Sequence, residues 1–182
     1  MEAMDNILRN LARKQIVVLE MPRSREKDML LFVSDLACRG SLRVVDGGNH
    51  FNVLSLSRMI RRKTSQVKKV LNRIFISRAF TCIQMEAMLR GLTPDRGPVV
   101  VIDLLHTFYD ENVDDQRSKY LLTSCVRHLK RLSHILPLMV SISPPPRLEM
   151  RPFLKTMLLE AADSAWYWKV EPTSQSQLTL WE

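Results

Sequence analysis

The stretch QIVVLEMPRSREKDMLLFVSDLAC, residues 15–38, decides how the fold of this chain is interpreted. Residues 15–20 are apolar and β-branched between their two polar ends, which predicts a short buried strand. Residues 29–38 carry apolar side chains at helical spacing and predict a helix. The connection between them, residues 21–28, is polar. A buried strand, a polar loop and a helix in this order are typical of the first unit of a parallel α/β sheet.

The connecting loop has the spacing of a phosphate loop that lacks the glycines. Aligned on the pattern G-x-x-x-x-G-K-[ST], the residues MPRSREKD keep only Lys27. Met21 and Glu26 stand where glycines let backbone N–H groups close around a phosphate, and Asp28 stands where a hydroxyl ligates magnesium. Two side chains therefore crowd the loop, and two carboxylates repel a polyphosphate. We expect nucleotide turnover to be negligible.

Composition bounds the class of protein. The chain has 182 residues, 46% of them hydrophobic and 25% charged, which suits one domain with a substantial core. No apolar run approaches the ~20 residues that span a bilayer, and the N-terminus lacks a secretory signal, so we expect a cytoplasmic protein without membrane contact. Three cysteines, Cys38, Cys82 and Cys125, and four histidines show no zinc spacing, and we predict no structural metal.

The rest of the chain alternates between predicted strands and helices. Strands are predicted at residues 42–46, 74–77, 99–103 and 138–142, with closing strands at 165–170 and 178–181. Helices are predicted at residues 53–62, 65–73, 80–90, 115–133 and 152–161. Several strands are apolar without alternation, so both sheet faces must be covered. We predict a single α/β domain over residues 15–170, a mostly parallel sheet with helices on both faces, between a helical lead (1–14) and a C-terminal tail (171–182).

Four segments, in this order, resemble the RecA/RadA-type recombinases. They are the loop described above, VDGGNHF at residues 45–51, ISRAF at residues 76–80 with Gln84, and VVVID at residues 99–103. The resemblance covers residues 16–170 and implies a RecA-like P-loop core with a degenerate Walker A motif. It also implies that Asp103 holds the position of the Walker B carboxylate. Gly48 then stands where the family has its catalytic glutamate.

These departures point to a paralogue of the recombinase that is not an enzyme and needs no cofactor. The alternative is a weak ATPase in which Lys27 and Asp103 still hold ATP and magnesium. For Asp103 we favour a structural role left over from such a site. For Lys27, contact with an anion at the helix N-terminus and simple exposure to solvent remain equal alternatives.

A basic segment gives the main binding hypothesis. The net charge is +8 and the isoelectric point about 9.8, which favours an anionic partner. Seven cations without an intervening acid lie between residues 57 and 73: Arg58, Arg61, Arg62, Lys63, Lys68, Lys69 and Arg73. The first three share one helical face, whereas a solvated face normally mixes signs. We predict DNA contact here; an acidic protein, or no partner, are the alternatives.

The C-terminal tail carries a second motif. Gln177, Leu178, Thr179, Leu180 and Trp181 resemble the pentapeptide Gln-Leu-[Ser/Asp]-Leu-Phe with which bacterial repair proteins bind the sliding clamp. In such peptides the leucines and the aromatic residue fill pockets while the glutamine fixes the register. The alternative is an edge strand of the domain.

These features together favour a non-catalytic RecA-like accessory protein of DNA repair or recombination. It would bind DNA through the basic helical face and position a recombinase or a repair polymerase, in the cytoplasm at the nucleoid. The alternative functions are the weak ATPase with an eroded phosphate loop and an adaptor that joins a repair polymerase to the sliding clamp.

Overall fold

The computed structural model describes residues 7, 11, 15–94, 97–147 and 150–168. Within these residues the strands form one six-stranded sheet with the order β3-β2-β4-β5-β1-β6, and every pairing is parallel. The strands are β1 (Ile16–Glu20), β2 (Leu42–Asp46), β3 (Ile74–Arg78), β4 (Val99–Ile102), β5 (Leu138–Ile142) and β6 (Ser164–Tyr167). The prediction of a single α/β domain built on a parallel sheet is confirmed.

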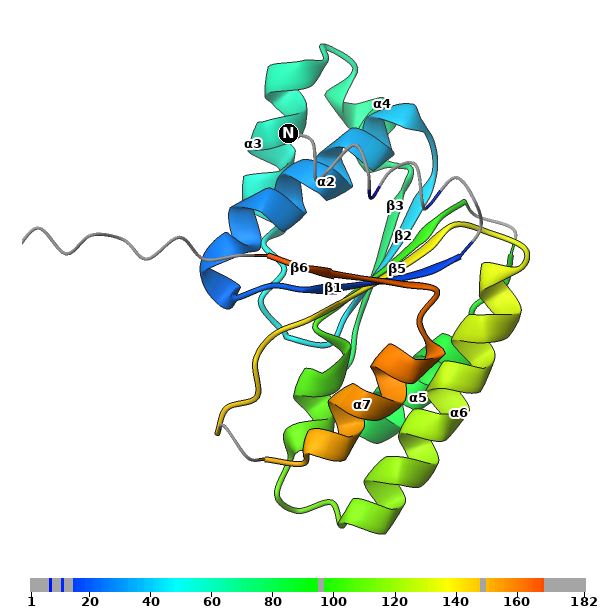
Figure 1. The fold of residues 1–182 in the computed structure, drawn as a ribbon. Coiled ribbons are helices and arrows are strands. Elements are labelled where there is room, and N and C mark those ends of the chain that lie inside the picture. The colour runs from blue at the N-terminus through cyan, green and yellow to red at the C-terminus, as the bar shows by residue number, and fades with distance from the viewer. Residues whose placement is uncertain (1–6, 8–10, 12–14, 95–96, 148–149, 169–182) are drawn as a thin grey trace, which may run out of the picture.

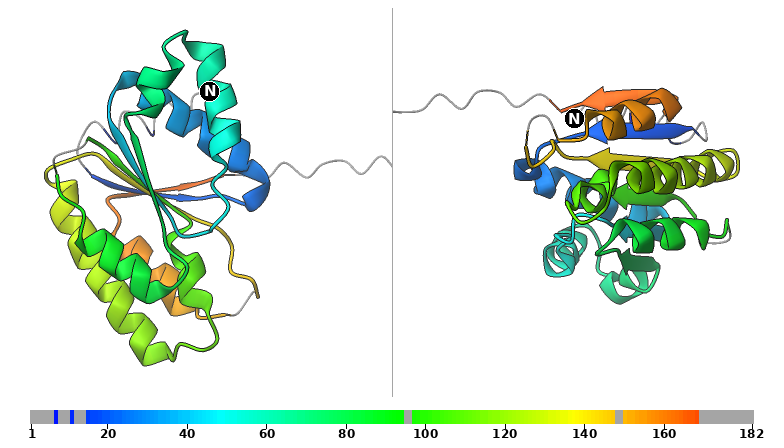
Figure 2. Two further views of the ribbon diagram at one scale, coloured as in Figure 1. Left: turned by 180° about the vertical axis from the view of Figure 1, so that it is seen from behind. Right: turned by 90° about the horizontal axis from the view of Figure 1, so that it is seen from below.

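Helices cover both faces of the sheet, as expected. The α-helices are α2 (Glu26–Arg39), α3 (Val53–Lys63), α4 (Val67–Leu71), α5 (Cys82–Arg90), α6 (Asp115–Ser133) and α7 (Pro152–Ala161). Two 3-10 helices, η1 (Arg23–Arg25) and η2 (Leu104–Tyr109), follow β1 and β4. Figures 1 and 2 show α2, α3 and α4 on one face and α5, α6 and α7 on the other. None of the helices in the described ranges is both long and apolar enough to cross a membrane.

The core has two halves, one on each side of the sheet. Along β1, Val17 and Leu19 pack toward α2 and α3, while Ile16 and Val18 pack toward α6 and α7. Because both sets are buried, the strand is apolar throughout instead of alternating. Ile7 and Leu11, from the predicted N-terminal lead, are helical and are 1% and 3% exposed in the half that contains α2.

Several element boundaries agree with the sequence pattern. The observed α6, β5 and α7 have the predicted limits, and Asp114 caps α6 by accepting the N–H of Arg117 at 2.8 Å. Residues 164–167 form the closing strand β6, one residue earlier than predicted. The second predicted closing strand, at residues 178–181, lies outside the described residues.

Other limits were predicted wrongly, among them the start of α5, which is Cys82 instead of residue 80. Helix α2 begins at Glu26 instead of residue 29, because Glu26 and Asp28 are acids that stabilise a first helical turn. Strand β4 ends before Asp103, whose φ of 51° is left-handed and turns the chain out of the sheet. The helix expected at residues 65–73 is reduced to α4, which lies between two polar turns.

The sheet has one border where the strands end and another where they begin. All strands point the same way, so every strand ends at one edge, here called the carboxyl edge, and begins at the other, here called the amino edge. Helices α2, α5, α6 and α7 each lie between a strand that ends at the carboxyl edge and the next strand, and α3 with α4 makes the same connection between β2 and β3. The C-terminal ends of α2, α4, α5 and α6 therefore lie at the amino edge (Figure 1). Ligands of open parallel sheets usually bind at the carboxyl edge.

Candidate functional site

The loop after β1 lies at the carboxyl edge and bonds to itself. The N–H of Met21 donates to the carbonyl of Ile142 at 2.9 Å, and Pro22 has no N–H. The next residues form η1, in which Arg25 donates to the Pro22 carbonyl at 2.9 Å and Glu26 donates to the carbonyl of Arg23. A phosphate loop works because its N–H groups converge on the ligand. Here the N–H groups of Met21, Arg25 and Glu26 are already engaged by the protein.

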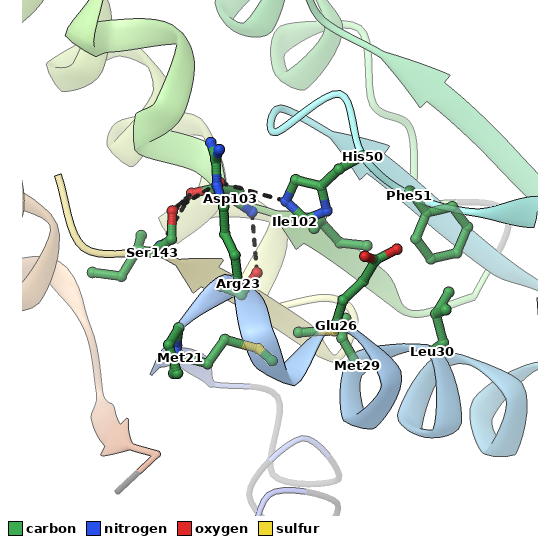
Figure 3. A pocket seen from close by; sticks show the side chains of 13 residues that line it. Met21, Arg23, Glu26, Met29, Leu30, His50, Phe51, Ile102, Asp103 and Ser143 are labelled. Atoms are coloured by element: carbon green, nitrogen blue, oxygen red, sulfur yellow. Dashed lines mark hydrogen bonds and ion pairs between the residues drawn. The ribbon is translucent and has the colours of Figure 1, made fainter. Parts of the chain in front are cut away.

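The space under this loop is nearly filled by side chains. A cavity of about 20 Å³ lies between the loop, α2 and the ends of β4 and β5 (Figure 3). That is room for about one water molecule, whereas small-molecule sites usually enclose ~300–1,000 Å³. Met21 and Glu26, the residues at the two glycine positions, both line the cavity, and Met21 is only 7% exposed. The loop has no room for a nucleotide phosphate in this conformation.

The other positions of the phosphate-loop pattern do not converge on this cavity. Lys27 is exposed in the first turn of α2 and is not among the residues that line the cavity. The carboxylate of Asp28 lies 3.5 Å from the guanidinium of Arg25. Lys27 and Asp103, the two predicted nucleotide-binding residues, are therefore not brought to a common site.

Asp103 follows β4 and is held by the end of β5. Its carboxylate accepts the backbone N–H of Ser143 at 3.0 Å and the hydroxyl of Ser143 at 2.8 and 2.9 Å. Its own N–H donates to the hydroxyl of Ser141 at 3.0 Å. The residue is 3% exposed. Asp103 thus joins two neighbouring strands at the carboxyl edge, as a structural residue would.

An arginine and a histidine from distant loops complete the cluster around Asp103. A guanidinium nitrogen of Arg23 lies 3.7 Å from one carboxylate oxygen, and Nε2 of His50 lies 3.6 Å from the same oxygen (Figure 3). Arg23 also donates to Nδ1 of His106 at 2.7 Å. Sequence reasoning missed Arg23 and His50: both lie in the segments that carry the resemblance, residues 21–28 and 45–51, but the pattern gave neither position a role. We call Asp103, Ser143, Arg23, His50 and His106 the Asp103 cluster.

The pKa shifts within the Asp103 cluster favour internal pairing. Interaction with Asp103 raises the pKa of His50 above 6.5, against the opposing effect of burial. Burial lowers the pKa of His106 below 6.5, and the charge of Arg23 adds to this shift, so His106 is a neutral acceptor. For Asp103, burial opposes ionisation, but the interactions with His50 and Ser143 outweigh it and lower the pKa below 3.8. The carboxylate therefore stays ionised at neutral pH, and the positive charge of Arg23 lies beside it within the protein.

The position implied for the catalytic glutamate is occupied by His50. A Cβ atom on Gly48 would lie 2.4 Å from Nε2 of His50 and 3.0 Å from Cβ of Asp103. A glutamate at position 48 does not fit unless the imidazole moves away. The Asp103 cluster therefore stands where the resemblance implies water activation, and its one carboxylate, that of Asp103, is already bound by Ser143.

The predicted basic face is present on the surface of α3, α4 and the residue before β3. Arg58, Arg61 and Arg62 are all exposed on α3, as their spacing predicts, and Lys68 and Lys69 are exposed on α4. Arg73 is half-buried. Lys63 pairs with Asp35 of α2 at 2.6 Å and donates to Ser34 at 2.7 Å. In the described part of the chain, Lys63 is the only one of the seven cations in an ion pair.

The remaining predicted sites are partly outside the structure. The clamp-like residues Gln177, Leu178, Leu180 and Trp181 lie outside the described residues. The cysteines Cys38, Cys82 and Cys125 are free thiols. Across residues 15–94, 97–147 and 150–168, no three His, Cys, Asp or Glu side chains are grouped so that they could hold a metal ion.

Comparison with known proteins does not assign the chain to a family. No protein-family model matches the chain, and no curated protein matches it in sequence. The resemblance to recombinases therefore rests on the short segments and on a fold that is consistent with a RecA-like core.

Proposed function

We propose that this chain is a non-catalytic RecA-like accessory protein of DNA repair or recombination that binds DNA through α3 and α4. The observation that carries the proposal is the contrast between the closed phosphate site and a basic face in which, of the seven cations, only Lys63 pairs with a described acid. An enzyme of this fold class needs an open loop at the carboxyl edge, whereas a DNA-binding accessory protein needs only an exposed array of cations. DNA as the partner places the protein at the nucleoid in the cytoplasm.

The basic face has the properties of a phosphate-binding surface. Arg58, Arg61 and Arg62 project from one helix side into solvent, and Lys68 and Lys69 continue the array on α4. A shallow concavity beside the lysines is lined by Ser65, Gln66 and Asn72, whose polar groups are of the kind that contact phosphate and sugar. Such contacts fix a nucleic acid without reading its sequence. We therefore expect binding with little sequence preference.

The salt dependence of DNA binding tests this proposal. Anisotropy of a labelled 20-base-pair duplex between 50 and 300 mM salt measures the slope of log K against log salt. With three to five phosphates engaged, we expect a slope of about −3 to −5. Changing Arg58, Arg61 and Arg62 to glutamate should weaken binding about 10- to 100-fold and flatten the slope by about 3. Absence of binding by the unaltered protein, or an unchanged slope in the variant, would overturn the proposal.

The alternative of a weak ATPase has a separate test. A ligand present at 100 times its Kd stabilises a protein by about 2.7 kcal/mol, which for a chain of this size raises Tm by roughly 5–10 °C. Because the loop is closed, we expect 5 mM ATP with magnesium to leave Tm unchanged. A rise in Tm that Lys27→Ala abolishes would favour the ATPase.

A second candidate function, an adaptor for a repair polymerase, is favoured by β3, which is the outermost strand on one side of the described sheet. In the described sheet β3 pairs only with β2, and Ile76 on β3 is 37% exposed. A groove of about 680 Å³ runs between β3 and α5. Edge strands with apolar side chains accept extended peptides by strand addition. The partner would be an extended apolar segment of another protein.

Substitution at this edge separates the adaptor from the DNA-binding function. Ile76→Asp, on the strand that lines the groove, should abolish capture of a purified repair polymerase while leaving the duplex affinity unchanged. Deletion of residues 175–182 should remove capture of the sliding clamp alone, if the tail is the clamp-binding peptide. Retained partner capture by the edge variant would exclude β3 as the docking strand.

A further inference from the structure

The basic face on α3 and α4 is one part of a wider asymmetry between the two edges of the sheet. Because helices end at the amino edge, cations near their C-termini gather there. Beyond the predicted face, the exposed cations at or near these helix ends are Arg39 on α2, Arg90 on α5, and Arg127, Lys130 and Arg131 on α6. They lie on both helical layers. The predicted segment, residues 57–73, contributes to one layer only.

The cations on the C-terminal half of α6, like most of those on the predicted face, have no acidic partner among the described residues. Arg127, Lys130 and Arg131 are exposed, and none of them forms an ion pair with a described residue. The acid on the neighbouring helix, Glu86 of α5, accepts the hydroxyl of Ser124 at 2.8 Å and lies 3.9 Å from Arg90. The positive charge of this half of α6 therefore faces solvent.

Compensation of the helix dipole explains only part of this arrangement. Cations in a last helical turn are favoured by the negative end of the dipole, which accounts for Lys130 and Arg131. Arg127 precedes that turn, and the effect falls off within one turn. Lys68 and Lys69 lie on a helix too short for a strong dipole. A shared ligand accounts for all of these cations together.

At the carboxyl edge, by contrast, opposite charges are paired. Arg78 binds the buried carboxylate of Asp46 at 3.0 Å, Arg151 binds Asp115 at 2.9 Å, and Lys155 binds Glu20 at 2.7 Å. The acids of the described residues are concentrated at this edge, in the loops after the strands and in the first turns of the helices. The excess positive charge of the chain is therefore displaced toward the amino edge.

We infer that the DNA-binding surface continues from α3 and α4 around the amino edge to the C-terminal half of α6, so that one phosphodiester backbone contacts both helical layers. The inference rests on the proposed function, since it extends the same binding site. It places the nucleic acid across the amino edge, where the strands begin. The carboxyl edge, where parallel sheets usually bind ligands, faces away from it.

Charge reversal at the two ends of α6 tests this location. The test variant changes Arg127, Lys130 and Arg131 to glutamate. The control variant changes Arg117, Lys119 and Arg147 to glutamate, which alters the net charge equally but acts at the carboxyl edge. A neutral variant with glutamine at positions 127, 130 and 131 guards against helix destabilisation, and thermal melting by circular dichroism confirms that each variant is folded. Duplex binding is measured over the same salt series as above.

We expect the test variant to weaken duplex binding at least 10-fold and to flatten the salt slope by about 2, and the neutral variant to show about half of both effects. The control should change affinity less than 3-fold. Equal losses in test and control variants would show a net-charge effect and overturn the inference. If the α3 variant loses binding while the test variant does not, the proposed function stands and the extended surface fails. If the unaltered protein does not bind duplex, the proposed function fails first.

Discussion

The two edges of the sheet differ in how their charges are satisfied. At the carboxyl edge Arg23, Arg78 and Lys155 each meet a carboxylate of a neighbouring loop or strand. At the amino edge Arg39 and Lys130 meet none within the described residues. In a parallel sheet the first edge normally receives the ligand, and its groups stay unpaired until the ligand arrives. The carboxyl edge, where a ligand usually binds, is therefore closed here, and the exposed cations without an acidic partner gather at the amino edge.

The largest effect on stability is expected from removal of the carboxylate that holds the closed edge together. Asp103→Ala leaves the N–H and hydroxyl of Ser143 without their acceptor, removes the charge that lies 3.6 Å from Nε2 of His50, and places alanine at a left-handed φ. We expect the free energy of unfolding to fall by about 3 kcal/mol, measured by urea denaturation. Asp103→Asn retains an acceptor oxygen and tolerates that φ, so it should cost about half as much. A loss below 1 kcal/mol for alanine would show that the cluster is not structural.

The fold of this edge was predictable from sequence, whereas its contacts were not. The apolar strand at residues 99–102 fixes where Asp103 emerges, because the end of a buried strand must reach the sheet edge. The packing of His50 against Asp103 depends on loop conformations and on side chains that are 53 positions apart, and no local pattern records such a contact. The closed loop was foreseen from the missing glycines, since their absence acts locally.

A methyl group added at each edge compares their packing directly. A Cβ on Gly47, at the carboxyl edge, would lie 2.8 Å from the backbone oxygen of Asp103 and 2.5 Å from the side chain of Met85. A Cβ on Gly40, at the amino edge, meets nothing within 4 Å. We expect Gly47→Ala to destabilise the protein by about 2 kcal/mol and Gly40→Ala to be neutral or slightly stabilising, by thermal and urea denaturation. Equal costs at both positions would contradict the close contacts described for Gly47.

The two histidines of the Asp103 cluster should make opposite contributions to the pH dependence of stability. The raised pKa of His50 stabilises the fold fully below 6.5, and this contribution disappears as pH rises through the folded pKa. The lowered pKa of His106 works the other way: its protonation favours the unfolded chain, so stability is lost as pH falls from 6.5 toward the folded pKa.

The measurement is urea denaturation of the unaltered protein and of the variants His50→Gln and His106→Gln between pH 5 and pH 8.5. The stability lost in His50→Gln should be greatest at acidic pH and shrink toward pH 8.5. His106→Gln should remove part of the loss of stability that acid causes. If both variants show the same trend with pH, the pairing of Asp103 with His50 would have to be abandoned.

The smallest effect is expected at the one position where the phosphate-loop pattern survives. Lys27 is exposed, contacts no cavity and stands in the first turn of α2, where the helix dipole disfavours a cation. Lys27→Ala should therefore change the free energy of unfolding by less than about 0.5 kcal/mol, toward stability if at all, and should leave the duplex affinity untouched. Arg23→Ala, four positions earlier, removes the contacts to His106 and Asp103, but Arg23 is 56% exposed at its side chain, so we expect a loss of about 1 kcal/mol or less. For both variants, urea denaturation measures the free energy of unfolding and anisotropy measures the duplex affinity. A larger loss at Lys27 than at Arg23, in either assay, would mean that the surviving lysine still serves an anion at the carboxyl edge and that this edge opens in solution.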